Sequence, residues 1–570
     1  MPLFPGSFST YLLTSVILCV PSLHAQEAAD TILLNGKIYT ENAAQPWAAA
    51  VAIRGGRIAA VGSDAEIKKL QGPATKVLDV GGHLVLPGFE DSHIHFIGGS
   101  ESLEAVALDT AETIVEVQSR VKSFATAHPD KKLISGLGWM YPIFGKVALP
   151  DKKYLDEVVP DRPVLLSAYD GHTSWANSKA LELAGITKTT PDPFNGVIVR
   201  DPTTGEATGA LKEEAGDLVE KRLRPKRTEE EEISAVVAGL KLANSFGITR
   251  VHSAGGDVEQ VEIFDKIRKR NLLTVRFYFA LYAAPPVITP ALIEKAESLR
   301  HRYHDEWLSE AAIKLYTDGV IESHTAAMLA PYTDDPSTSG RLNWTPERYR
   351  EAVLEFDRRG FQIWTHSIGD KGIRLALDAA EEANKKNHHT DARDRLEHIE
   401  DPDATDIPRF GKLNIIASMQ PLHAYPNADV LEVWARNVGP QRAQTAWPWN
   451  DLLLSNAHLA FGSDWPVVTL DPWKAIQTLL TRETLEGNPK GGWIPQQRIT
   501  LKQAIDGYTL GAAYAAFLEK TEGSIEPGKL ADLIVVSQNL FEIPTTQIHS
   551  THVLFTVVDG KIVYQNLIEK

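Results

Sequence analysis

The stretch GFEDSHIHF, residues 88–96, places His93 and His95 two positions apart at the end of an apolar run. Residues i and i+2 of a β-strand face the same side, so both imidazoles would point at one place beyond the end of the strand. Imidazole nitrogens are ligands for metals such as zinc. The pair therefore predicts part of a metal site, whose other ligands must come from elsewhere in the chain.

Further residues of ligating chemistry occur in a similar setting, close to the carboxyl ends of predicted strands. Apolar strands alternate with helical stretches, a pattern typical of parallel α/β architecture. Eight strands are predicted, at residues 86–95, 247–255, 274–282, 312–319, 360–370, 395–400, 414–421 and 458–466. This pattern favours a (β/α)8 TIM barrel, whose active site lies at the carboxyl ends of the strands. The candidate residues there are His93, His95, Lys314, His366, His398 and Asp464.

Two other regions complete the predicted architecture. About 150 residues separate the first two barrel strands, far more than a crossover helix needs, which predicts a large insertion at about residues 97–228. Because it leaves the carboxyl end of the first strand, we expect it to cover the mouth of the barrel. Residues 26–86 and 523–570 both read as short strands with tight turns, and neither has enough apolar surface to fold alone. We expect them to form one β-sandwich domain, with the barrel domain at residues 87–522.

The composition limits partners and location. The chain of 570 residues has 74 acidic and 58 basic residues, a net charge of −16, and no long basic run, which argues against nucleic acid as a partner. The only cysteine, Cys19, lies in the apolar segment YLLTSVILCVPSLHA, which ends in small residues near Ala25. We expect a signal peptide at residues 1–25 and a periplasmic or secreted protein; the competing interpretation is a buried N-terminal helix. No integral membrane segment is predicted in the mature chain.

Segments along the chain resemble one known family. They are GFEDSHIH, DGHTSWANSKAL (170–181), TGALKEEA (208–215), IKLYTDG (313–319), THSIGDKGI (365–373), LEHIE (396–400), ASMQPLH (417–423), FGSDWPV (461–467) and GSIEPGKLADLIVV (523–536). In this order they resemble the amidohydrolase superfamily, in its YtcJ-like (amidohydrolase 3) branch. That branch includes N-substituted formamide deformylase and is related to D-aminoacylases.

The resemblance implies a metal centre and a reaction. In such enzymes the His-x-His pair and Asp464 would bind one divalent metal, His366 and His398 a second, and a carbamylated Lys314 would bridge them. Zinc is the expected metal, and one or two ions remain open. A metal-activated hydroxide would then hydrolyse a C–N bond in an amide, N-acyl or formamide substrate, with Asp464 as general base and acid.

Other residues are weaker candidates for contact with a small-molecule amide substrate. His172 and His423 could stabilise an oxyanion or contact substrate, with His252 and Asp318 as further candidates. An aromatic mouth is predicted from Trp139, Tyr141, Trp175 and Trp465. A deaminase or cyclic-amide hydrolase would share these ligands, and a non-catalytic barrel protein would lack the metals. The sequence leaves the oligomeric state open, a homo-oligomer included.

Overall fold

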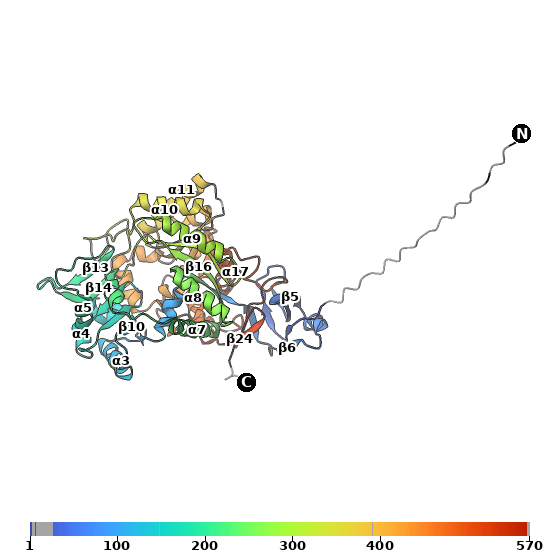
Figure 1. Ribbon diagram of the computed structural model, residues 1–570, viewed down its shortest axis with the longest axis horizontal. Coiled ribbons are helices and arrows are strands. Elements are labelled where there is room, and N and C mark those ends of the chain that lie inside the picture. The colour runs from blue at the N-terminus through green and yellow to red at the C-terminus, as the bar shows by residue number, and fades with distance from the viewer. Residues whose placement is uncertain (3–5, 7–26, 148, 390, 567–570) are drawn as a thin grey trace.

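The computed structural model describes residues 1–2, 6, 27–147, 149–389 and 391–566 (Figure 1). The predicted signal peptide at residues 1–25 lies outside this part of the chain, apart from residues 1, 2 and 6. Within the described ranges, no helix is both long enough and apolar enough to cross a membrane.

The centre of the molecule is a sheet of eight parallel strands. In order around the sheet they are β8 (Phe89–Ile94), β15 (Ile248–Gly256), β16 (Arg276–Tyr282), β17 (Leu308–Tyr316), β18 (Gln362–Gly369), β19 (Arg395–Asp401), β20 (Ile416–Met419) and β21 (Leu459–Phe461). The backbone N–H of Asp464 donates to the carbonyl of His93 at 2.7 Å, which joins the region after β21 to β8. The sheet is therefore the predicted (β/α)8 barrel.

The first and last predicted strands extend beyond the observed barrel strands. Residues 86–95 divide into β7 (Leu84–Pro87), which pairs with strands outside the barrel, and β8, which pairs with β15. The prediction of one continuous strand was wrong because the chain passes from one sheet to another at Gly88. The last strand ends at Phe461 rather than at residue 466, and Asp464 has a left-handed φ of 60°, which is incompatible with extended strand geometry.

Helices surround the barrel, and several of them have side-chain caps at their amino termini. The long ones on this surface are α7 (Glu229–Ser245), α8 (Val258–Lys269), α9 (Pro290–Arg302), α10 (Pro346–Arg358) and α11 (Asp370–Asn387) (Figure 1). Helix α7 starts with a capping box in which Thr228 and Glu231 satisfy each other's backbone N–H groups. Thr289 and Thr345 cap α9 and α10, and proline occupies the first turn of each.

The insertion, which lies between β8 and β15 in the sequence, forms a separate sheet. Its strand order is β13 (Gly196–Arg200), β14 (Ala207–Glu213), β12 (Thr173–Ala176), β11 (Val164–Ala168), β10 (Ile134–Trp139) and β9 (Val106–Ala107). The helices α3 (Ile114–Ala127), α4 (Lys153–Asp156), α5 (Ser178–Ala184) and α6 (Asp217–Leu223) accompany it. Figure 1 shows this unit at one end of the molecule, with the barrel between it and the strands β5, β6 and β24.

Both ends of the chain build the remaining domain, as the sequence predicted. One sheet has the order β24 (Lys561–Gln565), β23 (Val553–Val558), β22 (Leu533–Val536), β7, β2 (Lys37–Tyr39) and β3 (Trp47–Ala48). The other has the order β5 (Arg57–Gly62), β4 (Ala50–Arg54), β1 (Thr31–Leu34) and β6 (Lys76–Asp79). Leu33 and Val51 from the second sheet share one core with Val85 and Val535 from the first, so the two sheets form a β-sandwich.

Buried ion pairs connect the barrel strands to the C-terminal segment. Arg276 on β16 donates from Nε to Oδ2 of Asp532 at 2.6 Å, and Arg250 on β15 donates from Nε to Oε2 of Glu522 at 2.6 Å. Both arginine side chains are completely buried. Because removal of one partner would leave an uncompensated buried charge, these pairs hold the C-terminal segment against the amino-terminal halves of the strands.

Candidate active site

His93, one of the predicted metal-binding residues, is completely enclosed. It lies on β8 with no exposed surface, and its Nδ1 is 2.5 Å from Oε2 of Glu397 on β19. Its other nitrogen, Nε2, lies 3.5 Å from Oδ1 of Asp464 and 3.4 Å from Nζ of Lys314. Burial, together with the nearby Lys314 ammonium, lowers the pKa of His93 to about 4. The ring is therefore neutral near pH 7, and the Glu397 carboxylate fixes the proton on Nδ1.

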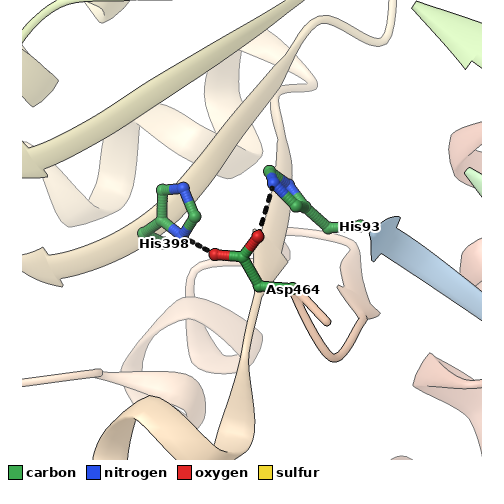
Figure 2. Close-up of side chains that lie close together, drawn as sticks. All are labelled: His93, His398 and Asp464. Carbon is green, nitrogen blue, oxygen red and sulfur yellow. Dashed lines mark ion pairs between the residues drawn. The ribbon is translucent and has the colours of Figure 1, made fainter. Parts of the chain in front are cut away.

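His93, His398 and Asp464 converge on one point, although they come from β8, β19 and the segment after β21, which are far apart in the sequence (Figure 2). One ligand atom from each lies within 4.8 Å of the other two. Asp464 Oδ2 is 3.9 Å from Nδ1 of His398, and Oδ1 is 3.2 Å from Nε2 of His95. Burial alone would raise the pKa of Asp464, but His93 and His95 outweigh it and hold that pKa well below its usual range. The group presents two imidazoles and a carboxylate, the donor set of many zinc sites.

Lys314 and His366 lie beside this cluster. The ring of His366 on β18 has its centre 4.5 Å from that of His398, and its Nε2 is 3.1 Å from the carbonyl oxygen of Gly319. Lys314 on β17 is completely buried, and burial lowers its pKa to about 8. The structure thus brings all six predicted metal ligands into one neighbourhood, with His93, His398 and Asp464 at its centre.

The two predicted substrate-contacting histidines reach the same place from different regions. His172 belongs to the insertion, and its Nδ1 lies 2.7 Å from Oε2 of Glu213, while its ring centre is 5.5 Å from that of His366. His423 follows β20, with Nε2 3.7 Å from Oδ2 of Asp464 and Nδ1 3.4 Å from Oε1 of Glu400. Carboxylates therefore orient both rings.

The backbone is strained at two positions of this cluster. His398 has φ of 74° and Asp464 has φ of 60°, both in the left-handed region that residues other than glycine rarely adopt. At His398 this conformation interrupts the regular alternation of β19, in which Arg395 and Glu397 share one face. Such strain is concentrated at functional sites, where the surrounding structure enforces it.

A cavity of about 530 Å³ opens over the histidines and Asp464. Its walls combine barrel residues, among them His95, His366, His398 and Asp464, with His172 and Glu213 of the insertion. The insertion therefore covers the mouth of the barrel, as expected from its point of departure. The volume suits a small molecule.

Two further candidates, His252 and Asp318, have structural surroundings. His252 is buried in the barrel interior, where its Nδ1 is 3.0 Å from Nη1 of Arg395. Asp318 lines the cavity, but its carboxylate accepts the backbone N–H groups of Ala327, Ile368 and Gly369, which indicates a structural role.

The prediction of an aromatic mouth was wrong in its residues. Trp139, Tyr141 and Trp175 are buried in the core of the insertion, and Trp465 packs in the barrel core. None of these four is among the residues that line the cavity. Its aromatic lining comes instead from Tyr169, Tyr282 and Tyr316. Tyr169 was not singled out because sequence alone does not show which face of an inserted sheet meets the barrel, whereas Tyr282 and Tyr316 end the barrel strands β16 and β17.

Three carboxylates that orient the histidines were also missed. They are Glu397 beside His93, Glu213 beside His172 and Glu400 beside His423. A signal existed for the first: Arg395 and Glu397 occupy alternate positions of a strand that a TIM barrel buries on both faces. Buried charges of this kind are paired or functional.

Comparison with known proteins agrees with this barrel and its cluster of histidines. The family model described as "Amidohydrolase family" matches residues 76–564, and the chain belongs to that family. It is 33% identical to Protein LONG AFTER FAR-RED 3 of Arabidopsis thaliana, covering 94% of this chain and 92% of the relative. It is 31% identical to putative amidohydrolase YtcJ of Bacillus subtilis (93% and 98%) and 26% identical to N-substituted formamide deformylase of Arthrobacter pascens (94% and 98%).

A solved structure supports the same fold. An uncharacterized metal-dependent hydrolase from Pyrococcus horikoshii superposes with a TM-score of 0.72 and 26% identity, covering 90% of this chain and 99% of that one. Because the match covers 90% of this chain, it includes at least part of the barrel, the insertion and the sandwich.

Proposed function

We propose that the protein is a metal-dependent hydrolase that cleaves a C–N bond in a small amide, N-acyl or formamide substrate. The observation that carries this proposal is the convergence of His93, His398 and Asp464 at the floor of a cavity roofed by the insertion. The relatives support the bond type, because the N-substituted formamide deformylase matches along 94% of this chain.

The residues of the cluster fit a divalent metal. Burial lowers the pKa of His93 and of His398, so both rings are neutral and each keeps a lone pair. Nδ1 of His398 is buried, and no described residue forms a hydrogen bond with it. A buried polar atom without a partner is costly unless a ligand satisfies it. Zinc suits this donor set best, and His95 and His366 lie close enough to complete one or two sites.

The chain's own groups divide the catalytic work. A bound divalent metal supplies acidification of water and polarisation of the substrate carbonyl. Asp464 takes the proton of the attacking water and delivers it to the leaving nitrogen, since its carboxylate is ionised and faces the cavity. His172 and His423 lie on the cavity wall, where they stabilise the negative charge that develops on the carbonyl oxygen.

Lys314 has a separate proposed role as the bridge between two metals. The ammonium at Nζ first loses a proton, and the neutral amine then attacks carbon dioxide and loses a second proton, so that an anionic carbamate replaces the cation. Incorporation of ¹³C-labelled carbon dioxide tests this directly: the wild-type chain should show a carbamate carbon resonance that Lys314→Ala lacks. A wild-type spectrum without that resonance, in protein loaded with two metals, would contradict the carbamate.

The proposed location is periplasmic or extracellular. Its basis is the apolar segment around Cys19, followed by small residues near Ala25. Mass determination of the mature protein from its native host tests it, because cleavage near Ala25 removes a defined N-terminal mass.

A hydrolysis panel tests the activity. Metal-loaded enzyme would be assayed with N-substituted formamides, N-acyl amino acids, dipeptides, cyclic amides and aminopurines. We expect turnover in one of the open-chain amide groups and loss of turnover in His398→Ala. Release of ammonia from aminopurines would support a deaminase instead, and stoichiometric metal without any turnover would favour a non-catalytic barrel.

A further inference from the structure

The cavity wall above the metal cluster is acidic. Seven of its lining residues other than Asp464 carry carboxylates: Asp170, Glu213, Glu214, Asp217, Asp318, Glu322 and Glu400. In the described part of the chain, no lysine or arginine lines the cavity. Lys314 lies beneath the histidines, and Lys212 points away, donating from Nζ to the carbonyl oxygen of Ser323 at 3.0 Å. Glu213 pairs with His172 and Asp217 with Lys221, whereas the other wall acids form no ion pair with a lysine or arginine among the described residues.

Some of these carboxylates are already satisfied. Glu213 pairs with His172, and Asp318 accepts three backbone N–H groups. Asp170, Glu322 and Glu400 differ, since their hydrogen-bond donors are mainly neutral. Glu322 Oε1 accepts the hydroxyl of Tyr169 at 2.6 Å, and Asp170 Oδ2 accepts that of Tyr141 at 2.8 Å.

Glu400 completes this group of three wall acids. Its Oε2 accepts the indole N–H of Trp434 at 2.8 Å, and its Oε1 is 3.4 Å from Nδ1 of His423. Burial, followed by the charges of Glu400 and Asp429, raises the pKa of Glu322 well above its usual range. Without a ligand Glu322 therefore favours its protonated form, and a bound cation would favour the ionised form.

The acidic wall suits an organic cation better than it suits a further metal ion. His93, His398 and Asp464 are the described residues whose ligand atoms converge closely enough to hold an ion, and the wall acids form no such group. Tyr169, Tyr282 and Tyr316 line the same cavity. Aromatic faces combined with dispersed carboxylates recognise ammonium and guanidinium groups.

We infer that the cavity selects amides that carry a cationic alkylammonium or guanidinium group, bound by Asp170, Glu322 and Glu400, while the amide bond faces Asp464. This substrate class rests on the proposed hydrolase function. It disfavours N-acyl amino acids, whose free carboxylate would meet the acidic wall.

Three acetamides of similar length, with a cationic, a neutral or an anionic group at one end, provide the test. N-acetyl-1,4-diaminobutane is cationic, N-butylacetamide neutral and N-acetyl-4-aminobutanoate anionic. Binding to the full-length, metal-loaded chain would be measured by calorimetry, and turnover in a separate assay. We expect the cation to bind at least about tenfold more tightly than the neutral amide, the ratio typical of one charged hydrogen bond, and the anion to bind most weakly.

Two variants test whether the wall acids cause the preference for the cationic amide, and a third is the control. Glu322→Gln should reduce the ratio of cation to neutral affinity, whereas Tyr169→Phe keeps the carboxylate and should keep most of the preference. Glu347→Gln makes the same change at an exposed position on α10 and should leave the ratio unchanged. Metal content per chain, measured for each variant, verifies that the metal cluster is intact.

The outcomes separate the inference from the function on which it rests. Equal affinity for cation and neutral amide in the wild-type chain, or undetectable binding of the cation, overturns the inference. Turnover of all three amides at equal rates has the same effect but leaves the hydrolase function standing. A clear cation preference in binding, without hydrolysis of any amide tested, supports the inference and counts against the proposed reaction.

Discussion

Nδ1 of His93 lies 2.5 Å from Oε2 of Glu397, and neither side chain has any exposed surface. Burial would raise the pKa of Glu397, but Arg395 and His93 outweigh it and keep the carboxylate ionised. An ionised carboxylate only accepts hydrogen bonds, so the imidazole must donate from Nδ1. Nε2 then carries the lone pair toward Asp464, as a metal ligand requires.

Glu397→Gln should therefore weaken metal binding although Glu397 is not itself a ligand. The glutamine amide can donate to Nδ1, which would move the ring proton to Nε2 and remove the lone pair from the cluster. We expect a loss of about 10–100-fold in metal affinity, the range for changes to groups that orient metal-binding histidines. Metal competition with a chromophoric chelator measures it.

A matched control is available on a neighbouring strand. Glu310 on β17 is also buried, and neither of its oxygens has a hydrogen-bond partner among the described residues. Burial raises its pKa well above the usual range, so it is a neutral acid that glutamine resembles closely. Glu310→Gln should bind metal like the wild type. Equal affinity in both variants and the wild type would rule out an orienting role for Glu397.

Metal removal should lower thermal stability, because an ion bound only by the folded state stabilises it. At a free concentration about 100 times the dissociation constant the linkage contributes about 2.7 kcal/mol. Scanning calorimetry with and without zinc should show this increase in the wild type and little of it in His398→Ala. The comparison uses the shift on adding metal, since the substitution also changes the stability of the apo protein. A full shift in His398→Ala would remove His398 from the ligand set.

The barrel was predictable from the sequence because its signals are local. Apolar runs such as 274–282 indicate the strands, and polar residues near strand ends, such as His93 and Asp464, indicate the site, without knowledge of the fold. Glu397 escaped attention because its role depends on His93, 304 positions earlier in the chain. The separation of two residues in the sequence does not show how close they are in space until the strand order is known.

The sequence predicted where the insertion lies, over the mouth of the barrel, but not which of its residues face the cavity. Its length and point of departure predicted a cover over the barrel mouth, and His172 was singled out from its motif. Trp139 and Trp175 were assigned to the mouth, yet they form part of the core of the insertion. Only the packing of that sheet decides that Tyr169 faces the cavity instead.

Arg276→Leu should destabilise the fold by about 3–5 kcal/mol, because it leaves Asp532 buried without its charged partner. Urea unfolding measures the change, and Arg276→Leu combined with Asp532→Asn should recover part of the loss. Arg302→Leu is the control: Arg302 pairs with Glu262 at 3.0 Å on the surface, and such pairs contribute about 1 kcal/mol or less. Equal losses in the two arginine variants would show that the pair between barrel and C-terminal segment has no special weight.

Asp464→Asn should be the most severe catalytic change that leaves the metal cluster largely formed. Asparagine tolerates the left-handed backbone at this position, and the bond from its N–H to the carbonyl of His93 does not involve the side chain. The amide still offers an oxygen to a metal but accepts no proton, so both proton transfers fail and kcat should fall by about 10²–10⁴-fold. If Asp464 only stabilised the turn before Trp465 and Pro466, asparagine would serve nearly as well. Measuring kcat together with metal content per chain distinguishes the two roles: a rate close to wild type at equal metal content would show that another group moves the proton.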